Sequence, residues 1–179
     1  MTTPLVLTFV GDDKPGLVNA ISEKVAAHGA TWLESRSVRL AGKFAGVVLV
    51  SVPDDRLTQL ELSLRDLAHA GLRISIERGG AIELERPSRA IALDVVGHER
   101  PGIVRDVTQA LIRLGVNIEE LASGLESAPF TGEVMFRARA RLRAPEGLAL
   151  DDLRQPLERL AGEIMVDLTV GEDESPRLS

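Results

Sequence analysis

The stretch Leu7-Thr-Phe-Val-Gly-Asp-Asp-Lys-Pro-Gly-Leu-Val18 decides the fold, because the chain carries it twice. It returns 86 residues later, without a gap, as Leu93-Asp-Val-Val-Gly-His-Glu-Arg-Pro-Gly-Ile-Val104. The register continues past the motif at further positions, which align Gly29 with Gly115, Glu34 with Glu120 and Ser37 with Ser123. A chance match would not keep register over successive elements, so the chain consists of two copies of one module.

Each copy begins with a predicted strand, loop and helix. A short apolar run at residues 5–10 and again at 91–96 predicts the strand. Pro15 and Pro101 follow it and are expected in the first turn of the helix, where a fixed φ is favourable and a missing N–H costs nothing. Gly29 and Gly115 are expected to end the two helices. Apolar residues at helical spacing predict one buried stripe per helix, namely Leu17, Val18, Ile21 and Val25, then Ile103, Val104, Val107 and Leu111.

The rest of the first copy predicts a strand at 30–40, a tight turn at 41–43, a strand at 44–52, a second helix and a last strand at 72–77. Asp54 and Asp55 are expected to cap that helix, and Gly71 to end it. Its apolar stripe is Leu57, Leu60, Leu64 and Leu67, matched in the second copy by Leu150, Leu153, Leu157 and Leu160. The order βαββαβ predicts the α+β class, with two ferredoxin-like modules and antiparallel sheets.

The second copy holds seven extra residues, which we assign mostly to Ser127-Ala-Pro-Phe-Thr-Gly132. Pro156 lies inside the second helical pattern, so that helix is expected to start late or to kink. The predicted organisation is a first domain at 1–80, a linker at 81–88, a second domain at 89–171 and a flexible tail at 172–179.

Composition narrows the classes of function. The chain has a net charge of −6 and no cysteine, which excludes disulfides, thiolate catalysis and thiolate zinc sites. The first apolar stretch is too short for a membrane span and follows no basic leader, so we expect a cytoplasmic protein without membrane contact. An acidic chain without a basic arm disfavours direct binding of nucleic acid.

The loop–helix junctions are the best candidate sites. The start of a helix offers unpaired N–H groups and partial positive charge, which suit a carboxylate. Asp12 and Asp13 in the first copy and Glu99 in the second could accept an ammonium group, so the junction matches both ends of an α-amino acid. The competing interpretation is that the acids and the Pro-Gly pairs only cap and start the helices. Thr31 and Asn117, in the turn after the helix, could complete a polar pocket or merely form turns.

No catalytic arrangement is evident in the sequence. The three histidines lack metal-ligand spacing, and only His98 lies in a candidate ligand loop. The motifs of serine hydrolases, nucleotide-binding loops and dinucleotide-binding folds are absent. We therefore expect no enzyme, no cofactor and no metal.

Four arginines alternate along one predicted strand, at positions 137, 139, 141 and 143, and so share one face. Such a row could bind an anionic partner. It is more often a solvated sheet face neutralised by acids on the next strand, here Glu119, Glu120 or Glu126.

The two Asp/Glu-Lys/Arg-Pro-Gly motifs, each after a strand, resemble the opening of ACT domains. The tandem pair, the length and the 127–132 insertion resemble the family of glycine cleavage system transcriptional repressors. The resemblance implies amino-acid ligands held at module interfaces, a homodimer, and contacts from the loop before Pro-Gly and the turn after the first helix. Carried over, these are Gly11, Asp13 and Thr31 in the first copy, and Gly97, Glu99 and Asn117 in the second.

These observations leave three functions open. The leading one is a non-catalytic regulator that senses glycine or a similar amino acid and modulates transcription through a protein partner, a DNA-binding activator. The second is a free-standing regulatory subunit of an amino-acid biosynthetic enzyme. The third is an adaptor without a ligand.

Overall fold

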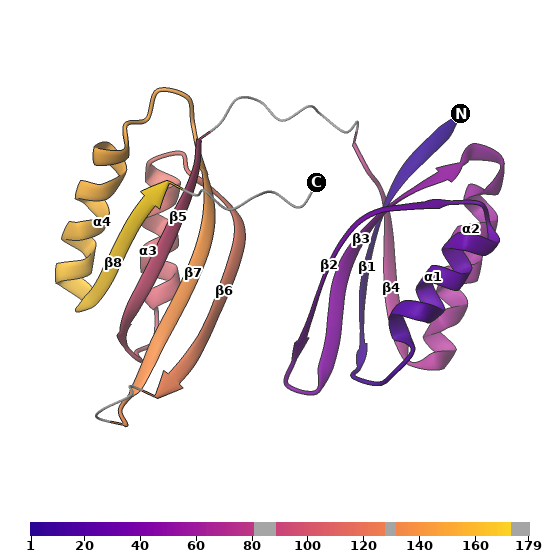
Figure 1. Cartoon of the computed structure of the whole chain (residues 1–179), viewed down its shortest axis with the longest axis horizontal. Helices are drawn as coiled ribbons and strands as arrows, with labels where there is room; N and C mark the ends of the chain where they lie inside the picture. Colours follow the sequence, from indigo (N-terminus) through magenta and orange to yellow (C-terminus); the bar gives the residue numbers. More distant parts are fainter. Residues whose placement is uncertain (81–88, 128–131, 173–179) are drawn as a thin grey trace. The chain divides into compact units, whose positions relative to one another are not determined.

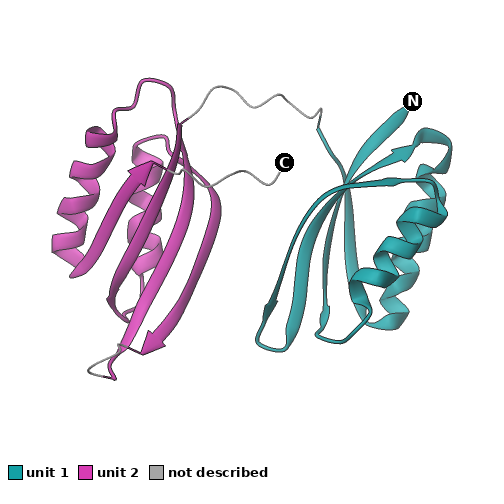
Figure 2. Cartoon of the chain, in the orientation of Figure 1, with its two compact units in different colours: residues 1–84 teal, residues 85–179 magenta. Residues whose placement is uncertain are grey.

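The computed structural model describes residues 1–80, 89–127 and 132–172. The chain divides into two compact units, residues 1–84 and 85–179 (Figure 2). Each unit is described below by itself.

Unit 1 is a four-stranded antiparallel sheet with two helices on one face (Figure 1). Its elements are β1 (Thr2–Asp12), α1 (Leu17–Ala27), β2 (Thr31–Leu40), β3 (Lys43–Pro53), α2 (Leu57–Arg65) and β4 (Leu72–Arg78). Short 3-10 turns, Asp54–Arg56 and Asp66–Ala70, flank α2. The strand order is β2-β3-β1-β4.

Unit 2 repeats this architecture with the order β6-β7-β5-β8. Its elements are β5 (Arg89–His98), α3 (Ile103–Arg113), β6 (Asn117–Ser127), β7 (Val134–Ala144), α4 (Leu150–Ile164) and β8 (Val166–Glu172). Both edge strands that follow the first helix carry a bulge at the same place, Trp32/Glu34 in β2 and Ile118/Glu120 in β6. The α+β class and the two ferredoxin-like βαββαβ modules are therefore confirmed.

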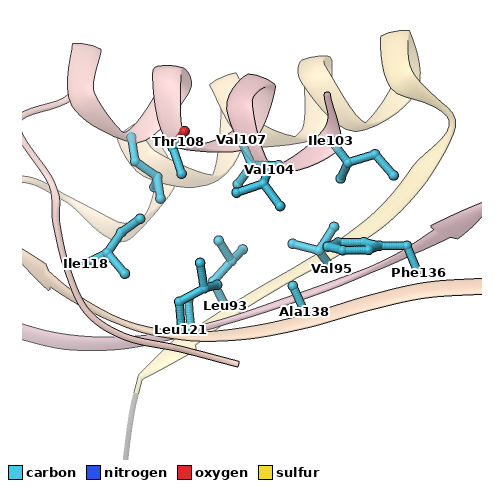
Figure 3. Close-up of a pocket in the computed structure, with 12 residues that line it drawn as sticks. Leu93, Val95, Ile103, Val104, Val107, Thr108, Ile118, Leu121, Phe136 and Ala138 are labelled. Carbon is cyan, nitrogen blue, oxygen red and sulfur yellow. The ribbon is translucent and has the colours of Figure 1, made fainter. Parts of the chain in front are cut away.

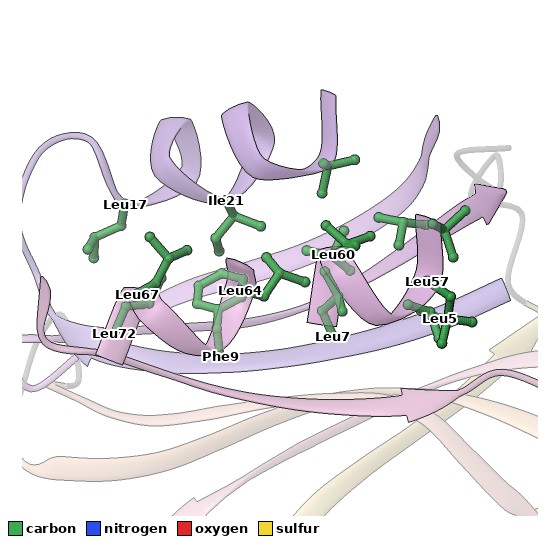
Figure 4. Close-up of a cluster of buried hydrophobic side chains, with 14 residues drawn as sticks. Leu5, Leu7, Phe9, Leu17, Ile21, Leu57, Leu60, Leu64, Leu67 and Leu72 are labelled. Carbon is green, nitrogen blue, oxygen red and sulfur yellow. The ribbon is translucent and has the colours of Figure 1, made fainter. Parts of the chain in front are cut away.

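One apolar core lies between helices and sheet in each unit. In unit 1 the stripe of α2 is fully buried, and its side chains interdigitate with those of α1 and β1 (Figure 4). Leu5, Leu7, Ile21, Leu60 and Leu64 have no exposed surface. The stripe of α1 is narrower than predicted, because Val18 is 44% exposed, and Val104 in α3 is likewise 41% exposed.

The predicted starts of three helices were wrong. Pro15 and Pro101 precede the helices rather than occupying their first turns, because Gly16 and Gly102 are the N-caps, with φ of 93° and 94°. This left-handed conformation is open to glycine at little cost. Asp54 and Asp55 do not cap α2, which has no side-chain cap. Instead, Asp54 lies in a 3-10 turn and accepts a 2.8 Å hydrogen bond from the Thr3 hydroxyl.

The predicted ends of three helices and the position of Pro156 can be compared with the structure. Gly29, Gly71 and Gly115 take positive φ after their helices, as predicted. Of the two alternatives for Pro156, the late start is wrong: α4 begins at Leu150 with Pro156 inside it. Proline there removes the N–H that would have bonded the carbonyl of Asp152.

Some predicted features lie outside the described residues, namely the 81–88 linker, residues 128–131 of the insertion and residues 173–179 of the tail. Glu172, placed in the tail by the sequence, is the last residue of β8. Within the described ranges, no helix is long and apolar enough to cross a membrane.

Candidate functional site

The β1–α1 junction of unit 1 is closed by the β2–β3 hairpin. The backbone N–H of Asp13 donates to the carbonyl of Gly42 at 2.9 Å, and its carboxylate pairs with Arg39 at 2.6 Å. Asp12 pairs with Lys43, and the hydrogen bond from that ammonium holds the pKa of Asp12 below its usual value. Neither acid caps α1. Both carboxylates therefore already have cationic partners.

Among the described residues, the equivalent junction of unit 2 lacks the two cations that pair with the acids of unit 1. In the strand ladders of unit 2, Leu125 and Met135 occupy the positions that Arg39 and Lys43 occupy in the hairpin of unit 1. Neither replacement carries a charge. The Glu99 side chain is exposed and, within the described ranges, has no ion pair or hydrogen bond. An ammonium group could bind at Glu99 without displacing a partner.

Charged side chains surround the start of α3. Asp106 is bridged by Arg100 at 2.8 Å and by Arg105 at 2.8 Å, and its side chain is only 17% exposed. Hydrogen bonds from these two guanidinium groups hold the pKa of Asp106 below its usual value, and the bond from Arg100 has the larger effect. The helix has no side-chain cap, so its first N–H groups are left for a ligand or water. This cluster was not predicted from the sequence, although basic residues before an acid in the first helical turn are the signal that could have indicated it.

Gly11 and Gly97 have structural reasons to be glycine. A Cβ at Gly11 would lie 2.9 Å from the carbonyl oxygen of Gly71, and one at Gly97 would lie 2.4 Å from Cγ1 of Val166. The close approach that these glycines permit is therefore to β4 and β8 of their own sheets. Their contribution to a ligand site is limited to the backbone.

The predicted site residues of one unit do not come together. Thr31 pairs with Ser51, which pairs with Pro4, and Gly11 lies seven residues further along β1. At the rise of a strand this is roughly 23 Å. In unit 2, Asn117 pairs with Arg143 and so with Ala90, again seven residues from Gly97. Loop and turn therefore lie at opposite ends of the sheet, so one ligand cannot contact both within a single module.

The arginine row of β7 has the structural role that the sequence favoured. Its guanidinium groups pair with acids on the neighbouring strands: Arg137 with Glu126 at 3.0 Å, Arg139 with Asp94 at 3.2 Å, Arg141 with Glu120 at 3.8 Å and Arg143 with Glu119 at 3.0 Å. Asp94, on β5, is the one acid that the sequence analysis did not name. The row is a neutralised sheet face.

The duplicated fold and the two loop–helix junctions define a class of protein, the tandem βαββαβ module. The ACT domain family matches residues 3–77. This match lies in unit 1, and unit 2 repeats both the fold and the motif, so the chain is similar to a tandem pair of ACT domains. Among the described residues, no cluster of side chains could hold a metal ion.

Particular relatives refine this class. The chain is 26% identical over 164 residues to the glycine cleavage system transcriptional repressor of Escherichia coli, covering 89% of this chain and 85% of the repressor. It is 31% identical over 172 residues to phosphoserine phosphatase SerB2 of Mycobacterium tuberculosis, covering 93% of this chain but only 40% of the phosphatase.

Solved structures agree over the whole chain. A protein from Galdieria sulphuraria, described only as unknown, superposes with a TM-score of 0.84 at 31% identity, covering 97% of this chain and 99% of its own. A structure described as a candidate glycine cleavage system transcriptional repressor has a TM-score of 0.73 at 20% identity, covering 98% and 99%. The latter likeness concerns the fold alone.

Proposed function

We propose that this chain is a non-catalytic regulatory protein that senses glycine or a similar small amino acid and modulates transcription through a protein partner. The observation that carries the proposal is the Glu99 carboxylate, which has no partner among residues 1–80, 89–127 and 132–172. It lies close in sequence to the start of α3, which has no side-chain cap. The family and the similarity to a transcriptional repressor support it.

The proposed site places the two ends of the ligand on opposite charges. The ammonium group binds Glu99, and the carboxylate binds the first N–H groups of α3, where the partial charge of the helix is positive. Gly97 contributes its backbone at the end of β5. Because Arg100 and Arg105 are engaged by Asp106, the helix rather than a free guanidinium receives the carboxylate.

The distance between loop and turn makes a homodimer part of the proposal. Asn117 lies at the far end of its sheet from Glu99, so one ligand contacts both only if they come from different chains. Such a ligand stabilises the dimer that completes the site. The ligand shifts the chain toward this dimer if the dimer binds it more tightly than the separate chains do. The corresponding site of unit 1, with Gly11, Asp13 and Thr31, is the weaker one, because Asp13 is already paired with Arg39.

Calorimetric titration of the whole chain with glycine, serine and other amino acids tests the proposal. We expect saturable binding that is lost in Glu99→Gln and reduced in Asn117→Ala. Asp13→Asn is the matched control, because it removes the equivalent carboxylate of unit 1 and should leave the affinity unchanged. The absence of binding by every amino acid would contradict sensing and leave the ligand-free adaptor.

The partner is proposed to be a DNA-binding activator in the cytoplasm, with no direct contact of this chain to nucleic acid or membrane. A second candidate is regulation of an amino-acid biosynthetic enzyme, favoured by the 31% identity to a phosphoserine phosphatase. Copurification separates the two, since the first requires a transcription factor in the complex and the second requires an enzyme. Recovery of neither would contradict both partner assignments.

A further inference from the structure

Unit 2 contains an apolar hollow beneath α3, between that helix and the sheet (Figure 3). Its cavity volume is about 20 Å³, slightly more than one water-sized sphere. Two of the side chains that line it, Val104 of α3 and Leu121 of the edge strand β6, are 41% and 47% exposed and therefore form its mouth. The hollow is a pocket of methyl size with an apolar mouth.

The internal repeat explains how the hollow arises. At several wall positions unit 2 carries a smaller residue than unit 1: Ile118 for Trp32, Val95 for Phe9 and Ala140 for Val48. Trp32 packs against the core of unit 1. Gains of one methyl group elsewhere, such as Ala138 for Gly46, do not compensate for the loss of an indole ring. At the mouth, Leu121 replaces Ser35 of unit 1, which makes the entrance apolar.

The walls offer no hydrogen-bonding group to an occupant. The one polar side chain among them is Thr108, and its hydroxyl already donates to the carbonyl of Arg105 at 3.0 Å. A water molecule needs two or more polar partners, and apolar cavities of this kind stay dry. The chemistry of the hollow thus selects an aliphatic group.

Two residues that line the hollow lie next to the loop that carries Glu99. Ile103, the first residue of α3, lies four residues after Glu99 and lines the hollow. Phe136 also lines it and pairs in the ladder with Gly97, at the other end of the same loop. A ligand anchored by its charged ends at this loop therefore has an apolar wall next to it.

We propose that the hollow receives the branched aliphatic side chain of the amino acid sensed by unit 2, so that valine, leucine or isoleucine binds in preference to glycine. This inference rests on the proposed amino-acid sensing. One methyl group enters the closed part, and the remaining carbons lie against Val104 and Leu121. Each buried methylene contributes a factor of about four to affinity. Valine, with three side-chain carbons, should bind about 60-fold more tightly than glycine if all three are buried, and about fourfold more tightly if only one is buried.

The test is calorimetric titration of the whole chain with glycine, alanine, valine and leucine. Ile118→Trp fills the hollow with the residue that unit 1 uses and should bring valine to within about threefold of glycine. Ile112→Trp is the matched control: Ile112 is 73% exposed on the same helix, so its replacement adds an indole without filling the hollow. Leu121→Ser, which restores the residue of unit 1 at the mouth, gives a second reading if Ile118→Trp does not fold by circular dichroism.

The outcomes separate the two proposals. Preference for valine that is lost in Ile118→Trp or reduced in Leu121→Ser, and kept in Ile112→Trp, supports the hollow as the side-chain site. Equal affinity for glycine and valine, or a valine preference that survives both hollow substitutions, overturns this inference and leaves amino-acid sensing intact. The absence of binding by any amino acid overturns both.

Discussion

Replacing Gly97 with alanine should destabilise unit 2, because this glycine lies against β8. The new Cβ would lie 2.4 Å from Cγ1 and 3.0 Å from Cα of Val166. Carbon atoms in contact prefer about 3.5–4.0 Å, so the side chain or the strand must move by about 1 Å. Val166 is only 7% exposed and pairs with Gly97 in the ladder, which leaves it little room to move.

The magnitude follows from two opposing effects. Overpacking a well-filled core costs about 1–3 kcal/mol. Replacing glycine by alanine restricts the unfolded chain and recovers about 0.4–1 kcal/mol. The net loss should be about 1–2 kcal/mol, which corresponds to a fall of about 4–16 °C in the unfolding midpoint of a domain of this size.

Thermal and urea unfolding followed by far-ultraviolet circular dichroism would measure this loss. Gly124→Ala is the matched control in the same sheet, because no heavy atom lies within 4 Å of where its Cβ would be. The control should be neutral or slightly stabilising, since glycine is unfavourable within a strand. Equal stabilities of the two variants would refute the packing argument for Gly97.

Three further perturbations test separate features. Leu60→Ala should lower the free energy of unfolding by about 2–5 kcal/mol, because Leu60 is fully buried. Leu62→Ala, on the same helix but at a side chain that is 58% exposed, should lower it by less than about 0.5 kcal/mol. Unfolding followed by the fluorescence of the single tryptophan measures both variants, and similar losses would contradict the assigned core. Hydrogen bonds from Arg100 and Arg105 depress the pKa of Asp106, so its stabilisation is present above the ordinary value of 3.8 and is lost as pH falls through the lower folded value. The urea midpoint of Asp106→Asn should therefore fall less than that of the unchanged chain between pH 5 and pH 3, and an identical fall would contradict the pairing. Ala41 has a φ of 49°, so Ala41→Gly should stabilise the hairpin by about 0.5 kcal/mol, and a lower thermal midpoint would count against strain at this turn.

The order of the elements could be predicted from the sequence because it is encoded locally and twice. Apolar residues at helical spacing predicted α1, α2, α3 and α4 without reference to distant residues, and glycines predicted the ends of the first three. Because both copies carry the same pattern, the first strand and both helices of the module were predicted from two stretches of sequence. The failures are also local: Pro15 was placed in the helix because proline favours first turns, but the left-handed Gly16 delays the start to Leu17.

The candidate site shows the limit of this reasoning. The motif and the resemblance pointed to both loops, but sequence alone could not say that Asp13 has a partner. That partner, Arg39, lies 26 residues away and comes near only because β2 and β3 form a hairpin beside the end of β1. The hollow under α3 could not be predicted for the same reason, because the sequence does not show that Ile118 lies beside the helix until its strand is packed against it.

By itself, therefore, the sequence determined the duplication, the α+β class and two candidate loops for a ligand. Only the tertiary structure decided that the loop with Glu99 and the turn with Asn117 lie at opposite ends of one sheet, and that Glu99, unlike Asp13, has no ion pair with any described residue. The physical reason is that a motif records distance along the chain. The register of an antiparallel ladder decides which residues meet across it.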